Sequence, residues 1–275
     1  MSLLQALVLG IVQGATEFLP ISSSAHLVIV PWLLHWKFEP KAEFVFDVLV
    51  QLGTLVAVII YFWKDLVDLV RAAIAGLLKR RPLEDPTSRM AWLIVVATIP
   101  AAVTGFLFKH VVEAAFQSPA AVSAFLLVTA AFLFLGERFG RRTRSLDALG
   151  FLDAILIGLA QAIALLPGVS RSGSTIAGGL SRSLRRLDAA RFAFLMAVPV
   201  MLGAGLIAAK DLLTGPNASA EIAPLVVGFL AAAVVGYLAI RWLLGFLARR
   251  PLTVFAAYCA AAGLAGLILS LVRGS

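Results

Sequence analysis

Long apolar stretches recur along the chain, and most polar residues lie in the short segments between them. A helix needs roughly 20 apolar residues to cross the hydrocarbon core of a bilayer. Six stretches come close to this length, at residues 44–63, 90–108, 119–135, 192–209, 222–240 and 252–272. The pattern therefore predicts an all-α polytopic membrane protein, with one membrane domain over residues 1–275 and six transmembrane helices.

Two further apolar segments, residues 3–36 and 148–181, have the same length of 34 residues. At about 1.5 Å per residue, a helix of this length is too long for one crossing and too short for two. Each segment has a proline and a polar cluster near its middle, "LPISSS" in the first and "LPGVSRSGS" in the second. Because proline ends a helix and small polar residues favour turns, we expect two re-entrant helical hairpins with these clusters at their tips.

Basic residues are distributed unevenly over the connecting segments. Of the 23 lysines and arginines, 17 lie in four segments, at residues 64–89, 138–147, 182–191 and 241–250. By the positive-inside rule these four segments are cytoplasmic. The first hairpin then enters the membrane from outside, and the second enters it from the cytoplasm.

The amino-acid composition distinguishes between nucleic acid and membrane lipid as the partner of this chain. Hydrophobic residues make up 61% of the chain and charged residues only 14%, whereas about a quarter of the residues in soluble domains are charged. The formal net charge is +8, but the basic residues lie in short loops and not on one aromatic-studded face. We therefore exclude nucleic acid as a partner and expect membrane lipids as the surroundings.

An internal repeat relates the two hairpins. Sliding the chain by 148 residues aligns "GIVQGATEFLPISSSAH" with "GLAQAIALLPGVSRSGS", and an offset of 131 aligns "IVVATIPAAVTGF" with "LVVGFLAAAVVGY". The chain then divides into halves 1–147 and 148–275, each with one hairpin and three crossings. An odd number of crossings inverts the second half relative to the first. Inverted repeats place broken-helix tips opposite each other near the bilayer midplane.

The first tip gathers ionisable and hydroxyl side chains at membrane depth. A charged side chain there costs about 2.5 kcal/mol or more, so it marks a functional site by default. Gln13 and Glu17 share one helical face before the proline, and His26 lies about one turn into the returning helix. The hydroxyl groups come from Ser22, Ser23 and Ser24. The structural alternative is that these serines only cap the helix and that His26 bonds a carbonyl group.

The second tip has the features of an anion site. Arg171 is a basic residue outside the loops, and its planar fork can engage two phosphate oxygens at once. Backbone amides at the start of a helix attract the same charge. The other candidate phosphate ligands in this tip are Ser170, Ser172, Gly173, Ser174 and Thr175. The structural alternative is an ion pair between Arg171 and Glu17, which is compatible with catalysis.

Three polar residues are candidates for a supporting role behind the reacting groups. Gln13 stands one turn before Glu17. Asp47 and Gln51 lie one turn apart in the first predicted span, where they either face the site or bond a neighbouring helix. The sequence does not separate these two roles for Asp47 and Gln51.

Together the two tips describe phosphoryl chemistry or phosphate binding within a membrane. Arg171, the helix amides and a divalent ion would stabilise the charge that builds up on phosphoryl oxygens. A hydroxyl group such as that of Ser23 is a candidate nucleophile, with His26 or Glu17 handling protons. Because the chain is apolar throughout, we expect the rest of the ligand to be a lipid.

The two tip motifs resemble those of the undecaprenyl-diphosphatase family, also known as bacitracin-resistance proteins. The similarity continues through "FDVLVQLGTLVAVIIYFW", "IPAAVTGFLF" and "FAFLMAVPVMLGAG", and so covers nearly the whole chain. It implies a multi-pass enzyme of bacterial cell-wall synthesis in the cytoplasmic membrane, which removes the terminal phosphate of undecaprenyl diphosphate. It also implies a magnesium or calcium ion as cofactor and a site that opens towards the periplasm.

The resemblance assigns roles to individual residues. The family's functional carboxylate, serine, histidine and arginine fall on Glu17, Ser23, His26 and Arg171. Ser170, Ser172 and Thr175 flank the arginine. Many members have a second glutamate at the position of Gln13, so here Glu17 would bind a metal ion together with substrate oxygens and water. Many also have Thr-Gly where this chain has Ser24 and Ala25, a change that keeps a hydroxyl group.

A transporter or flippase for polyprenyl phosphates is the alternative function, because inverted repeats with sites at the midplane are typical of transporters. The fold alone does not separate the two functions. A carrier needs only ligands for the anion, whereas a phosphatase also needs a nucleophile or a proton relay. The pair of Ser23 and His26 therefore favours the phosphatase.

Overall fold

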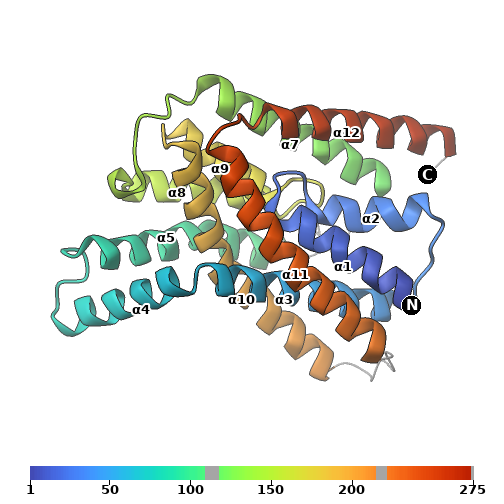
Figure 1. The fold of residues 1–275 in the computed structure, drawn as a ribbon, viewed down its shortest axis with the longest axis horizontal. Helices are drawn as coiled ribbons and strands as arrows, with labels where there is room; N and C mark the ends of the chain where they lie inside the picture. Colours follow the sequence, from blue (N-terminus) through green and yellow to red (C-terminus); the bar gives the residue numbers. More distant parts are fainter. Residues whose placement is uncertain (109–117, 215–221, 274–275) are drawn as a thin grey trace.

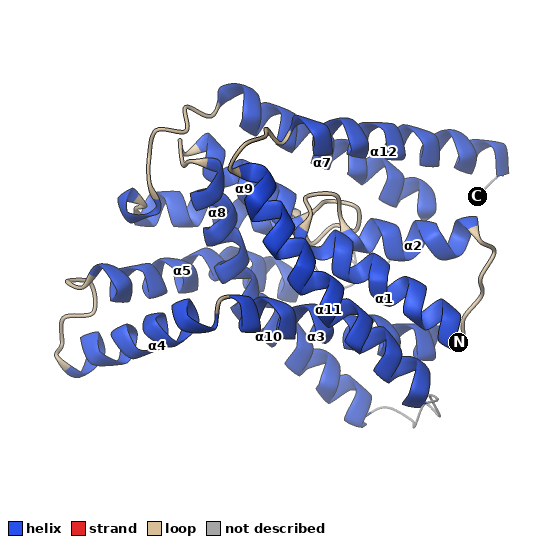
Figure 2. Cartoon of the chain, in the orientation of Figure 1, coloured by secondary structure: helices blue, strands red, loops and turns tan. Residues whose placement is uncertain are grey.

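The computed structural model of the chain describes residues 1–108, 118–214 and 222–273, and these residues form helices joined by turns and loops (Figure 2). The helices are α1 (Leu3–Phe18), α2 (Ser23–Leu33), α3 (Pro40–Tyr61), α4 (Trp63–Leu78), α5 (Pro86–Leu107), α7 (Pro119–Phe139), α8 (Phe151–Ile163), α9 (Arg171–Ser181), α10 (Arg186–Thr214), α11 (Ile222–Leu247) and α12 (Thr253–Arg273). A short 3-10 helix, η1 (Leu146–Ala148), precedes α8. The predicted all-α class is confirmed.

Six of these helices, α3, α5, α7, α10, α11 and α12, are long and apolar enough to cross a membrane. Each predicted span falls on one of them, which confirms the multi-pass membrane protein. Helix α5 begins at Pro86, before its predicted apolar stretch. Proline fits the first turn of a helix, and the Asp85 carboxylate accepts a hydrogen bond from the amide of Ser88 at 2.7 Å, so the helix starts in a polar segment.

The segments predicted as hairpins fold into two pairs of short helices, α1 with α2 and α8 with α9 (Figure 1). The two helices of each pair pack against each other across a turn, at residues 19–22 and 164–170. The second turn requires glycine, because Gly168 has a φ of +102° and an added Cβ atom would overlap the carbonyl oxygen of Val122. Both pairs have the size of a re-entrant hairpin, and the depth of each tip in the bilayer stays a prediction.

Equivalent helices of the two predicted halves make equivalent contacts. Helix α1 packs on α11, and its counterpart α8 packs on α5. An added Cβ atom at Gly10 would lie 2.5 Å from the carbonyl oxygen of Gly228, and one at Gly158 would overlap the carbonyl oxygen of Ala97. The predicted alignment matches residue 10 to 158 and residue 97 to 228. Both close approaches therefore fit an inverted repeat.

We expect Gly158→Val to weaken the packing of α8 on α5, because the new side chain meets the rigid backbone of Ala97. Overpacking of this kind costs about 1–3 kcal/mol, so the thermal midpoint of the detergent-solubilised protein should fall. Chromatography after a series of heating steps measures this midpoint. Gly245→Ala is the matched control in α11, since none of the described residues lies within 4 Å of a Cβ atom added there. A Gly158→Val protein with the wild-type midpoint would contradict the close approach.

Helix α4 was not predicted from the sequence, because its residues lie in the basic segment 64–89, which the positive-inside rule assigns to the cytoplasm. The helix follows α3 after a break at Phe62 and packs along α5. Its Leu69 is buried, whereas Val70, Ile74 and Leu77 are exposed. The lysines and arginines around these residues mask the helical spacing of the apolar positions.

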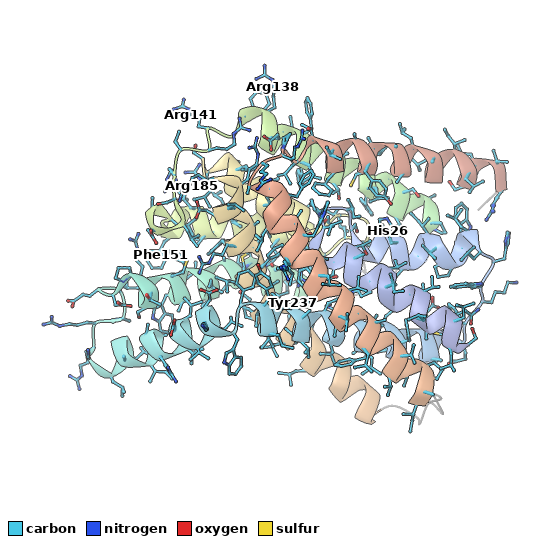
Figure 3. All side chains as sticks on the ribbon, in the orientation of Figure 1. His26, Arg138, Arg141, Phe151, Arg185 and Tyr237 are labelled. Atoms are coloured by element: carbon cyan, nitrogen blue, oxygen red, sulfur yellow. The ribbon has the colours of Figure 1, made fainter. Side chains whose placement is uncertain are left out.

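Two buried carboxylates each bind two arginines at the end of the molecule where the basic segments lie. Asp153 on α8 accepts hydrogen bonds from Arg144 at 2.8 Å and from Arg182 at 2.6 Å. Burial alone raises the pKa of Asp153, but these arginines outweigh it and hold the pKa at about 2. Glu137 on α7 is likewise bonded to two arginines, as a buried charge requires. Figure 3 shows further arginines pointing outward at this end: Arg138, Arg141 and Arg185.

Candidate active site

Glu17 occupies the last turn of α1 and links the two tips. Ser23 Oγ donates to Glu17 Oε2 at 2.5 Å, and Arg171 at the start of α9 donates from Nη2 to Glu17 Oε1. Gln13 donates from Nε2 to Glu17 Oε2 at 3.0 Å. The side chains of Glu17 and Arg171 are only 8% and 18% exposed. The structure thus places a carboxylate, a hydroxyl and a guanidinium together in a largely desolvated site.

Contacts to the backbone hold the two tips against each other. Ser24 Oγ in the first tip accepts a hydrogen bond from the amide of Gly168 at 3.2 Å. Ser172 Oγ in the second tip donates to the carbonyl oxygen of Leu19 at 3.1 Å. Ser24 and Ser172 are equivalent in the 148-residue alignment, so each tip reaches the turn of the other through the same position. The structure brings the tips together as the sequence predicted.

Two long helices support the turns from behind. On α7, Thr129 Oγ1 donates to the carbonyl oxygen of Gly168 at 3.0 Å and accepts from the amide of Ser170 at 2.8 Å. On α12, Cys259 Sγ donates to the carbonyl oxygen of Pro20 at 3.6 Å. Pro20 and Gly168 are equivalent in the alignment, so the supports follow the repeat as well. Thr129 and Cys259 lie within apolar spans, where sequence pattern gives no signal for such contacts.

The second tip starts α9 with a capped and largely buried first turn. Ser170 Oγ accepts from the amide of Gly173 at 3.1 Å. Thr175 Oγ1 donates to the carbonyl oxygen of Arg171 at 2.8 Å, so the hydroxyl proton of Thr175 is already used within α9. Ser174 Oγ is buried and has no hydrogen-bond partner among the described residues. The helix dipole and Arg171 together make the mouth of this tip favourable for an anion.

His26 on α2 is held on both sides of its ring. Its Nδ1 lies 2.7 Å from the carbonyl oxygen of Ser22, and its Nε2 lies 2.7 Å from Tyr258 Oη. Ser22 also caps α2, with a φ of 69° that residues other than glycine rarely adopt. The cap and the carbonyl bond expected under the structural alternative are therefore both present. No hydrogen bond among the described residues joins His26 to Glu17 or Arg171.

Tyr258 is a further residue beside the tips that sequence reasoning missed. It stands in the last span, 232 positions from His26, and nothing in the apolar periodicity links the two. Asp47 and Gln51 behave differently from Gln13, because the described residues show no hydrogen bond from their side chains to either tip. Their supporting role stays a prediction.

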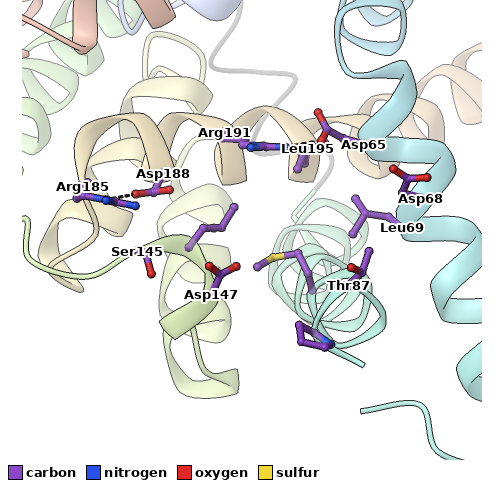
Figure 4. A pocket seen from close by; sticks show the side chains of 13 residues that line it. Asp65, Asp68, Leu69, Thr87, Ser145, Asp147, Arg185, Asp188, Arg191 and Leu195 are labelled. Carbon is purple, nitrogen blue, oxygen red and sulfur yellow. Dashed lines mark hydrogen bonds and ion pairs between the residues drawn. The ribbon is translucent and has the colours of Figure 1, made fainter. Parts of the chain in front are cut away.

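A hollow of about 320 Å³ lies elsewhere, between α4, α5, η1 and α10 (Figure 4). Four aspartates line it: Asp65, Asp68, Asp147 and Asp188. Two of them are paired, since Arg185 Nε donates to Asp188 at 2.6 Å and Arg191 bonds Asp65. None of the predicted site residues lines this hollow, so it is not part of the candidate site.

Glu17 is the carboxylate that the tips offer to a metal ion. The described part of the chain has no group of three or more His, Cys, Asp or Glu side chains arranged for a metal. In phosphoryl-transfer sites Mg²⁺ is bound through one or two carboxylates together with substrate phosphates and water. A single carboxylate fits a hard divalent ion that is shared with a bound phosphate, and it does not make a cage on its own.

Comparison with known proteins gives a consistent family. The model for "Bacitracin resistance protein BacA" matches residues 6–265. A relative from Thermomicrobium roseum named undecaprenyl-diphosphatase is 46% identical, over 98% of each chain. Relatives with the same name from Chlorobaculum tepidum and Methanosphaera stadtmanae are 45% and 42% identical, over 99% or more of each chain. Because these matches cover nearly its full length, the chain belongs to the BacA family of bacitracin resistance proteins.

Proposed function

We propose that this chain is an integral membrane phosphatase that hydrolyses undecaprenyl diphosphate to undecaprenyl phosphate and inorganic phosphate. The observation that carries the proposal is the hydrogen-bonded row of Ser23, Glu17 and Arg171, which joins a nucleophile, a proton acceptor and a phosphate ligand. The name of its relatives gives the substrate. The activity would recycle the lipid carrier of cell-wall synthesis and confer bacitracin resistance.

In the first step, Ser23 Oγ attacks the terminal phosphorus while Glu17 Oε2, 2.5 Å away, accepts its proton. The bond from this phosphorus to the bridging oxygen breaks, so undecaprenyl phosphate leaves and the phosphoryl group stays on Ser23. A water molecule then attacks the phosphorus, the bond to Ser23 Oγ breaks with return of the proton from Glu17 to Ser23 Oγ, and inorganic phosphate is released. His26 accepts the proton of this water, because the neutral ring keeps a basic nitrogen at Nε2.

Charge on the phosphoryl oxygens is stabilised from the second tip. Arg171 bonds Glu17 through Nη2, which leaves its other N–H groups for the substrate. The start of α9 adds the positive end of a helix dipole, which is preorganised and needs no reorganisation of water to stabilise this charge. A magnesium or calcium ion bound by Glu17 and the phosphate oxygens would neutralise further charge on the transferred group.

We place the protein in the bacterial cytoplasmic membrane, with the site open towards the periplasm. The orientation rests on the basic segments, which the positive-inside rule assigns to the cytoplasm. In Figure 3, Arg138, Arg141 and Arg185 lie at the end of the molecule away from His26. A lipid diphosphate in the outer leaflet would then meet the first tip.

Purified protein in detergent should release inorganic phosphate from undecaprenyl diphosphate when magnesium or calcium is present. Chelation with EDTA should stop the release, and either ion should restore it. A colorimetric phosphate assay measures the rate. If no phosphate appears but labelled polyprenyl phosphate moves between the leaflets of reconstituted vesicles, the proposal is wrong and the transporter alternative is favoured.

A further inference from the structure

We infer that Tyr258 is a positioning residue for the reaction, which acts through His26 by holding the orientation of the imidazole ring at its basic nitrogen. This inference rests on the proposed function, because it concerns His26 Nε2, the nitrogen that accepts a proton in that mechanism. The evidence is the hydrogen bond of 2.7 Å between Tyr258 Oη and His26 Nε2.

The proton on the imidazole is fixed by its other partner. A carbonyl oxygen only accepts hydrogen bonds, so the Ser22 carbonyl at 2.7 Å requires the proton on Nδ1 of the neutral ring. Nε2 is then the basic nitrogen, and the Tyr258 hydroxyl donates to it. Nε2 has a single lone pair, so the hydroxyl must turn aside before Nε2 takes a proton, and the phenol oxygen then accepts from the imidazolium because a phenol is both donor and acceptor. Tyr258 therefore stays bonded to His26 in both protonation states.

Hydrogen bonds from α12 to the first hairpin position Tyr258 beside His26. The next residue, Cys259, donates to the carbonyl oxygen of Pro20 in the same tip. At the far end of α12, Arg273 donates to the carbonyl oxygen of Trp32 at 3.1 Å and lies 4.8 Å above its ring. These contacts join α12 to the first hairpin at Cys259 and at Arg273. The Tyr258 and His26 rings lie almost parallel, with an interplanar angle of 9°.

Tyr258 is 44% exposed, and the bond that its hydroxyl makes to His26 can be tested apart from the packing of its ring. A purely structural tyrosine would contribute through its ring. A positioning residue contributes through its oxygen, and Tyr258→Phe removes the oxygen while keeping the ring.

The test compares Tyr258→Phe with Tyr237→Phe. Tyr237 lies on α11 (labelled in Figure 3), and its ring packs against that of Tyr61. We expect Tyr258→Phe to lower kcat for undecaprenyl diphosphate by about ten-fold with little change in KM, since an orienting partner contributes part of the effect of its acid or base. Tyr237→Phe should keep the wild-type kcat. In a His26→Ala background, Tyr258→Phe should cause no further loss. Wild-type kcat in Tyr258→Phe, or the same ten-fold loss in both backgrounds, would overturn the inference.

A second measurement needs no turnover. The chain has three histidines, so protein labelled with ¹⁵N-histidine gives a small set of ring resonances. One histidine should show the Nδ1–H form, and its Nε2 resonance should shift in Tyr258→Phe but not in Tyr237→Phe. If the wild type releases no phosphate while this shift is seen, the proposed function fails and the link between Tyr258 and His26 stands. If no resonance shifts, the link itself is wrong.

Discussion

Arg171→Ala is expected to lower the rate of phosphate release from undecaprenyl diphosphate by about 10²–10³-fold, the loss typical of removing one donor to a developing oxyanion. The variant should also lose stability. Glu17 is only 8% exposed, and removing one partner of a buried ion pair costs about 3 kcal/mol or more. Initial rates and thermal midpoints, taken on the same preparations, measure the two effects.

Arg171→Lys separates the two effects. Lysine keeps a positive charge beside Glu17, so most of the stability should return, but it lacks the planar fork that engages two phosphate oxygens. Its rate should therefore stay about ten-fold or more below wild type. Arg185→Ala is the matched control, since this side chain is 59% exposed and pairs with Asp188 at the other end of the molecule. A wild-type rate in Arg171→Ala would contradict the assignment of the site.

The spans and the helix pairs were predictable because the length of an apolar stretch determines whether it can cross the bilayer. A stretch of apolar residues must match the bilayer, and a stretch of 34 residues matches neither one crossing nor two. The meeting of the tips was predictable from the repeat, since an inverted copy places equivalent turns opposite each other. The bond between Arg171 and Glu17 follows from that placement, because intramembrane charges pair.

The contacts that orient the site were not predictable in the same way. Tyr258 and Thr129 lie on helices whose periodicity reports only burial, and their bonds to His26 and Ser170 depend on how the helices rotate about their axes. The division of labour between Glu17 and His26 is another example. Spacing along the chain places both near Ser23, whereas the structure puts the Glu17 carboxylate on the hydroxyl and turns the imidazole to Tyr258.

This division predicts that Ser23→Ala lowers the rate of phosphate release by at least about 10³-fold, as the loss of a nucleophile does in enzymes with a covalent intermediate. The change removes one hydrogen bond of 2.5 Å to the Glu17 carboxylate, which keeps its bonds to Arg171 and Gln13, so the free energy of unfolding should fall by about 1.5–3 kcal/mol. Substrate labelled with ³²P in the terminal phosphate allows a direct measurement. After an acid quench at short times, the label should appear on a peptide that contains Ser23 in the wild type and be absent in the variant.

Ser24→Ala provides the matched serine control for this experiment. Ser24 is the next residue, but its hydroxyl accepts a hydrogen bond from the amide of Gly168 and does not touch Glu17. Losing that bond loosens the contact between the tips without removing the nucleophile, so the rate should fall by about ten-fold or less and the label should still reach Ser23. Label on His26, or full turnover in Ser23→Ala, would instead mean that the imidazole or a water molecule attacks the phosphorus. Glu17 would then hold the Ser23 hydroxyl only as a ligand for the phosphate.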